Sequence, residues 1–139
     1  MKTLIGLFTT FLMAAGLVAV TTPPATAACS SYSGCVNTTT KASAPKKVRK
    51  GSRATVCGTT TTVASNAKPR GDLRITVTRN RGKFRFSKTV PYEGGKMCVV
   101  TKRLKKPGGY TVNASFLPQP GSIFNASSGS TGFDVTRRH

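Results

Sequence analysis

The sequence predicts an all-β domain, an antiparallel β-sandwich of about seven short strands behind an N-terminal signal peptide. Three observations predict it. Short runs alternate apolar and polar residues with the period of two that strands require, and long helical periodicity is absent. Threonine and valine are frequent in these runs, which favours strands over helices. Glycine, proline, asparagine or serine follows each run, as is typical of the turns in a sandwich.

The first 27 residues have the order of a secretory signal peptide. Lys2 precedes an apolar run over residues 4–20, and small residues ending in Ala25-Thr26-Ala27 follow it. A membrane anchor is the alternative, but the run contains two threonines and precedes Pro23-Pro24, so it is marginal for spanning a bilayer. We therefore expect cleavage after Ala27, a secreted, extracellular and cell-wall-associated protein, and no membrane span in the mature form.

The cysteines predict disulfides rather than a metal site. Four cysteines in a secreted chain are typical of two bridges, and lipidation of Cys29, as in a bacterial lipoprotein, would leave an odd number. Cys29 and Cys35 share a Ser/Gly-rich segment that can close a small loop. The second disulfide would then join Cys57 to Cys98. The chain has no C-x-x-C spacing and its one histidine is the terminal His139, so we expect no metal site.

The domain is expected to begin after a short lead-in. Residues 28–40 are predicted to form the disulfide-looped lead-in and residues 41–139 the sandwich. Alternation places Val56 on one face of its strand and Cys57 on the other, and it separates Cys98 from Met97 and Val99 in the same way. A bridge between Cys57 and Cys98 would therefore lie on the outer face of a sheet. The predicted strands are residues 53–59, 72–80, 83–90, 96–104, 109–116 and 130–136.

The chain resembles bacterial immunoglobulin-like domains in two segments, GSRATVCGTTTTV and GGKMCVVTKRLKKPGGYTVNASFLPQPGSIFNASSGSTGFDV. Such domains occur as repeats in surface and secreted proteins, many of them from actinobacteria. The resemblance covers about residues 38 to 136. It implies an immunoglobulin-like sandwich in which the strands of Cys57 and Cys98 are neighbours. The residues that carry it are Leu104, Gly109, Tyr110, Val112, Ala114, Phe116 and Phe124.

The inventory of reactive side chains predicts that the protein is not an enzyme. Its three acids, Asp72, Glu93 and Asp134, are far apart in sequence, so a carboxylate pair is not indicated. The terminal His139 leaves a catalytic triad without its base, and oxidised cysteines supply no thiolate. A phosphate-binding glycine loop is also absent from the sequence. We therefore expect no catalytic residues and no cofactor.

Charge is the strongest compositional signal. The chain has 22 lysines and arginines against 3 acids, and its pI is about 10.9. A field of that sign attracts polyanions, although a solvated and merely solubilising surface is the alternative. One cluster follows a predicted hairpin, and its members are expected on the outward side because Phe84 and Phe86 would fold inward. The candidate polyanion-binding residues there are Arg74, Arg79, Arg81, Lys83 and Arg85, with Lys88 beside them.

Two further basic clusters, residues 46–53 and 102–106, add to this surface. The sequence thus predicts a secreted, strongly basic binding or structural module at the cell wall or extracellular matrix. Its expected partners are anionic polymers, namely wall polymers or glycans, or another protein. Specific nucleic-acid recognition is not expected, because no recognition helix is visible and the aromatics point inward. Two alternatives are a cationic membrane-active or antimicrobial effector and an accessory module of a secreted enzyme.

Overall fold

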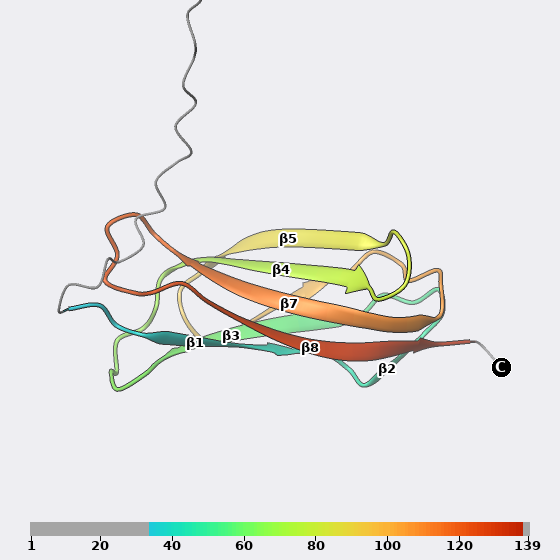
Figure 1. The fold of residues 1–139 in the computed structure, drawn as a ribbon, viewed down its shortest axis with the longest axis horizontal. Coiled ribbons are helices and arrows are strands. Elements are labelled where there is room, and N and C mark those ends of the chain that lie inside the picture. Colours follow the sequence, from blue (N-terminus) through green and yellow to red (C-terminus); the bar gives the residue numbers. More distant parts are fainter. Residues whose placement is uncertain (1–33, 138–139) are drawn as a thin grey trace, which may run out of the picture.

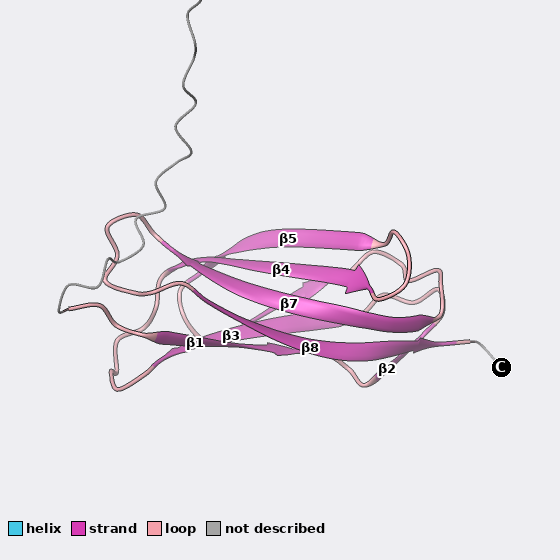
Figure 2. Cartoon of the chain, viewed as in Figure 1, coloured by secondary structure: helices cyan, strands magenta, loops and turns pink. Residues whose placement is uncertain are grey.

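Eight strands in two facing sheets make up the computed structural model, which describes residues 34–137 (Figure 2). Within those residues the chain forms no helix. One sheet has the order β1-β3-β6 and the other β2-β8-β7-β4-β5. Figure 1 shows β5, β4, β7 and β8 following one another in that order. The strands are β1 (Thr38–Ser43), β2 (Lys47–Arg49), β3 (Thr55–Thr62), β4 (Gly71–Arg79), β5 (Arg85–Tyr92), β6 (Lys96–Val100), β7 (Gly108–Pro118) and β8 (Ser127–Thr136).

The predicted fold class, an immunoglobulin-like β-sandwich, is confirmed. All strand pairs are antiparallel except β2 with β8, which run parallel. The strand count exceeds the expected seven because the first strand is divided. Its first part, β1, pairs with β3, and its second part, β2, pairs with β8 in the opposite sheet. Pro45 lies at the crossing, where its missing N–H removes no ladder hydrogen bond.

The core is built by the alternation that the sequence shows in β4 and β7. Leu73, Ile75 and Val77 point inward from β4 and are completely buried. They are in register with Phe116, Ala114 and Val112 of β7, which lie on the same face and are equally buried. The strand that opposes them, β3, carries Gly58 at an inward position. A side chain there would meet Leu73 at 2.8 Å, so the glycine makes room for that leucine.

A cluster of hydrogen-bonded hydroxyl groups lies toward one end of the sandwich. Thr40 in β1 contacts the Thr60 hydroxyl at 2.9 Å and the Ser127 hydroxyl at 2.7 Å. Thr38 contacts Ser127 at 2.7 Å and donates to the carbonyl of Asn125 at 2.7 Å. These bonds join β1 to the first half of β8, although the two strands belong to different sheets. Buried polar groups are tolerated here because each has a partner.

Phe124, in the loop between β7 and β8, packs against the hydrophobic core. Its neighbour in space is Val36, with which it forms an isolated bridge.

The segment before the sandwich is shorter than expected. Because β1 begins at Thr38, residues 38–40 of the anticipated lead-in belong to the first strand.

The disulfide between Cys57 and Cys98 is confirmed. The two residues are direct partners in the β3–β6 ladder, and their Cα atoms are 4.0 Å apart. Both face outward, opposite to the buried Val56 and Val99. Cys35 is also disulfide-bonded, but its expected partner Cys29 lies outside the described residues, as does the whole signal segment.

Gly129 in β8 offers a test of the contact between β1 and β8. A Cβ atom there would overlap the carbonyl oxygen of Thr40, which is fixed in the β1–β3 ladder. We expect Gly129→Ala to lower the free energy of unfolding by about 1–3 kcal/mol, because the two strands must separate. The matched control is Gly132→Ala in the same strand, where the nearest atom is 3.4 Å away. Its effect should stay within about 0.5 kcal/mol in urea denaturation. Equal losses in both variants would contradict the proposed contact.

The disulfide offers a second stability test. It closes a loop with a sequence separation of 41 residues. In the chain-entropy model a bridge of that span stabilises by about 4 kcal/mol at most. We expect the double variant Cys57→Ser, Cys98→Ser to lose no more than this and to keep the far-ultraviolet circular dichroism of a β-sandwich, because neither sulfur belongs to the core cluster of inward side chains. Complete unfolding of the variant at room temperature would show that the bridge is required for folding.

Candidate anion-binding site at one end of the sandwich

Three basic clusters that are separate in the sequence meet at one end of the sandwich. This is the end where β4 and β8 finish and where β3, β5 and β7 begin, at the right of Figure 1. Backbone hydrogen bonds join the segments: Gly51 N–H donates to Leu104 at 2.8 Å, and Asn80 N–H donates to Gly109 at 3.0 Å. We call this region the basic end. Its cations are Lys46, Lys47, Arg49, Lys50, Arg53, Arg79, Arg81, Lys83, Lys102, Arg103, Lys105, Lys106 and Arg137.

The predicted hairpin cluster is divided by the structure. Arg74 and Arg85 lie on the outer face of the five-stranded sheet, in register with Thr89 and Thr78, as the alternation predicts. Arg81 is exposed in the turn between β4 and β5.

Two residues of that cluster do not lie on the outward side, and the prediction for them is wrong. Arg79 is opposite Tyr110 and continues the inward row of Val77, because residues two apart share one face of a strand. Lys88 is opposite the buried Ile75, so it also belongs to the inward row, where it stays exposed on the last strand of the sheet.

Arg79 and Lys83 line a cleft at the basic end, together with the segment that follows β6. The cleft has a volume of about 430 Å³, within the range of small-ligand sites. Its lining includes no acid, and every charged side chain in it is positive. The lining residues are Arg79, Lys83, Phe84, Lys102, Arg103, Lys105, Lys106 and Tyr110. We call this the basic cleft.

The guanidinium of Arg79 is held in place at the wall of the basic cleft. Its Nη2 donates to the carbonyl oxygen of Pro107 at 2.8 Å. Gly82 and Gly108, both with positive φ, bring their backbones against the guanidinium, and a Cβ at Gly82 would be 2.9 Å from Nη1. The Nε atom is buried and has no hydrogen-bond partner among the described residues. An unpaired buried donor costs about 1–3 kcal/mol, so this group is incompletely compensated in the free protein.

Aromatic side chains form the floor of the basic cleft. Tyr110 is 1% exposed, and its hydroxyl donates to the carbonyl of Lys106 at 2.8 Å. Its ring stacks on Phe133 at 5.4 Å between centroids and meets Phe84 edge-on at 5.5 Å. Phe84 is half-buried, so part of its ring stays open to the cleft. Packed rings of this kind give the site a rigid apolar base.

The rim that carries Lys102, Arg103, Lys105 and Lys106 is anchored by the residue in its middle. Leu104 is completely buried in the core. Its N–H donates to the carbonyl of Ser52 at 2.9 Å, and its carbonyl accepts from Gly51. The sequence pattern predicts a strand as far as Leu104, but β6 ends at Val100. The four cations therefore stand on a fixed turn on either side of one apolar anchor.

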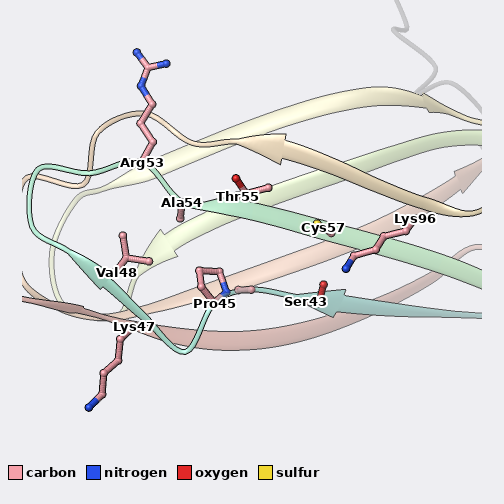
Figure 3. A pocket seen from close by; sticks show the side chains of 10 residues that line it. Ser43, Pro45, Lys47, Val48, Arg53, Ala54, Thr55, Cys57 and Lys96 are labelled. Carbon is pink, nitrogen blue, oxygen red and sulfur yellow. The ribbon is translucent and has the colours of Figure 1, made fainter.

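A second hollow lies where the chain crosses from one sheet to the other, and Figure 3 shows it closely. Its volume is about 620 Å³, and it is lined by Pro45, Val48 and Ala54 among others. Arg53 and Lys47 point away from it in opposite directions, and Lys96 alone leans across it toward Ser43. Because the cations do not converge here, the basic cleft is the better candidate for an anion.

The three acids do not gather at the basic end. Asp134 is in register with Gly109 at the basic end, whereas Asp72 and Glu93 lie toward the opposite end, beside Leu117 and after β5. Within residues 34–137 no group of histidines, cysteines and acids is placed to hold a metal ion. The same residues include no helix with the length and apolar character of a membrane span.

No protein-family model and no curated protein matches the chain. Among solved structures, it is similar to the CARDB domain of the PF1109 protein from Pyrococcus furiosus, whose crystal structure is described as a complex with di-metal ions. The identity is 13%, the TM-score is 0.40, and the match covers 75% of this chain and 90% of that domain. The solution structure of the same domain matches with 14% identity and a TM-score of 0.40, over 74% of this chain and 95% of that one.

Tyr110, in the floor of the basic cleft, is expected to make the folded protein less stable at alkaline pH. Burial raises the pKa of the Tyr110 phenol above its usual value of 10.0, and the nearby positive charge of Arg79 opposes the rise only in part. A raised pKa in the folded state means that deprotonation favours unfolding. The stabilising contribution is therefore complete below about pH 10 and is lost as the pH rises through the folded value.

Replacing Tyr110 by phenylalanine should test this. At pH 7 the variant should be less stable by about 1 kcal/mol, since the bond to Lys106 is lost. Above about pH 10 the difference in the free energy of unfolding between wild type and variant should shrink, because only the wild type carries the Tyr110 phenol. Urea denaturation between pH 7 and pH 11 measures both curves. Curves that stay parallel over this range would show that Tyr110 does not couple to folding.

Proposed function

We propose that this protein is a non-catalytic binding module that holds anionic polymers through its basic end. The observation that carries the proposal is the basic cleft, where six cations and no acid line one hollow. Cations placed together on anchored segments focus the field, whereas cations spread over a surface mainly confer solubility. A module that only needed solubility would have no reason to gather its charges at one end.

Export of the protein to the cell wall or extracellular matrix fits the same proposal. The N-terminal segment has the order of a signal peptide, and the disulfide of Cys57 and Cys98 suits an oxidising compartment. Wall polymers and acidic glycans are the anionic chains that a secreted module meets. The chain has only three acids, which are far apart in sequence, and its one histidine is the terminal His139, which supports binding rather than catalysis.

Two triple variants with the same net charge separate a site from bulk charge. The first changes Lys102, Lys105 and Lys106 at the rim of the basic cleft to serine. The second changes to serine Lys41, Lys68 and Arg70, which are also exposed but lie away from the basic end. We expect the rim variant to weaken binding of polyphosphate and heparin about tenfold or more, since each lost contact to a polyanion also loses released counterions. The control should change it much less.

Binding should also fall steeply with salt, because ions screen charges over about 8 Å at physiological ionic strength. Sedimentation or fluorescence anisotropy with labelled polymer at several salt concentrations gives both results. Equal weakening in the two triple variants would mean that net charge alone attracts the polymer and that the basic end is not a site. Leakage of anionic vesicles without polymer binding would favour a membrane-active role instead.

A further inference from the structure

We propose that the basic cleft is a discrete site for a phosphate monoester carried on a sugar ring, as found at the phosphorylated end of a glycan chain. This inference rests on the proposed function, since it names the ligand class of the same site. It goes beyond charge attraction, because it assigns separate roles to the wall, the floor and the rim of the cleft.

The wall of the cleft fits a phosphate group. A guanidinium has five N–H donors in a planar fork, and Arg79 donates one hydrogen bond, from Nη2 to Pro107, that holds it in place. A phosphate monoester carries about −1.5 to −2 charges and three acceptor oxygens at neutral pH. It can therefore accept from Arg79 and from the lysines of the rim at once, whereas a carboxylate offers only two oxygens. The excess of cations over acids in the lining favours the more highly charged group.

The floor of the cleft fits a ring. Phe84 lines the cleft and stays partly open, while Tyr110 beneath it is buried and hydrogen-bonded. A phosphate alone would leave this apolar surface uncovered, and covering it is favourable in proportion to the area removed from water. A ligand that joins a phosphate to an apolar ring face uses both parts of the site.

The lining also discriminates between kinds of ring. Apart from the Tyr110 hydroxyl, which is engaged with Lys106, the polar side chains in the cleft are lysines and arginines, which only donate hydrogen bonds. The hydroxyl and ring oxygens of a sugar can accept from them. A sugar hydroxyl can turn its O–H toward water while its oxygen accepts from a cation, whereas the exocyclic amino group of adenine or cytosine can only donate and would find no side-chain acceptor. The chemistry of the lining therefore favours a sugar phosphate over a nucleotide.

Ligand comparison with the wild-type protein tests the assignment directly. Isothermal titration calorimetry compares glucose 6-phosphate, inorganic phosphate, glucose and adenosine monophosphate, and glucose 6-phosphate should bind at one site. We expect glucose 6-phosphate to bind at least tenfold more tightly than inorganic phosphate or the nucleotide, and glucose alone to show no binding. Equal affinity for glucose 6-phosphate and inorganic phosphate would overturn the role of the ring. Tighter binding of the nucleotide would overturn the choice of a sugar.

Two variants test the residues. Arg79→Lys keeps the charge but removes the fork, and it should weaken glucose 6-phosphate binding about tenfold or more. The matched control is Arg70→Lys, at an exposed position before β4 and far from the cleft, which should leave the affinity unchanged. Phe84→Leu should bring the affinity for glucose 6-phosphate down to that for inorganic phosphate, which provides an independent test if Arg79→Lys fails to fold. Unchanged affinity in a folded Arg79→Lys variant would overturn the proposal.

The outcomes also separate this proposal from the broader one. If polyphosphate binds at the basic end but glucose 6-phosphate does not bind, the discrete site is wrong and the polymer-binding function stands. If glucose 6-phosphate binds in the expected order but neither polyphosphate nor heparin binds, the polymer-binding function is wrong and the discrete site stands.

Discussion

The core and the basic cleft both depend on one constraint, the alternation of side chains along β4. Residues two apart share a face, so the row that begins with Leu73 and runs through Ile75 and Val77 continues to Arg79. The first three are buried in the core, and the fourth arrives at the end of the sandwich, where its charge can reach solvent while its stem stays packed. A shift of register by one residue would expose the core row and turn Arg79 outward together. The packing that stabilises the fold therefore also holds the guanidinium at the wall of the cleft.

Much of the fold could be predicted from the sequence for the same reason. Alternating runs reveal β3, β4, β5, β7 and β8 directly, and the opposite faces of Val56 and Cys57 place the disulfide on the outside of a sheet. The division of the first strand could not be predicted. Its residues are mostly threonine, lysine and serine, and their burial depends on contacts with Thr60 and Ser127, which are 20 and 87 positions away in the chain. Alternation carries no signal when both faces of a strand are polar.

The site was less predictable, because it depends on which segments the topology brings to one end. Residues 46–53 and 102–106 are visible as basic clusters, but nothing in the local sequence shows that Gly51 bonds to Leu104 or that Lys102 and its neighbours line a cleft with Arg79. Two signals could have been used. Arg79 is two residues after Val77, and this spacing already places it on the inward face of the strand. A single leucine between two pairs of cations, as at Leu104, indicates an anchored turn rather than the end of a strand.

The concentration of cations at the basic end lowers the stability of the folded state. Like charges repel one another, and the compact state bears that repulsion more than the unfolded chain does. The fold offsets it with a disulfide between β3 and β6, a buried Leu104 beneath the rim, and a guanidinium bonded to Pro107. None of these neutralises charge, and the Nε of Arg79 keeps no partner among the described residues. An anion in the cleft would supply the missing charge, so its affinity would come partly from relief of repulsion in the free protein.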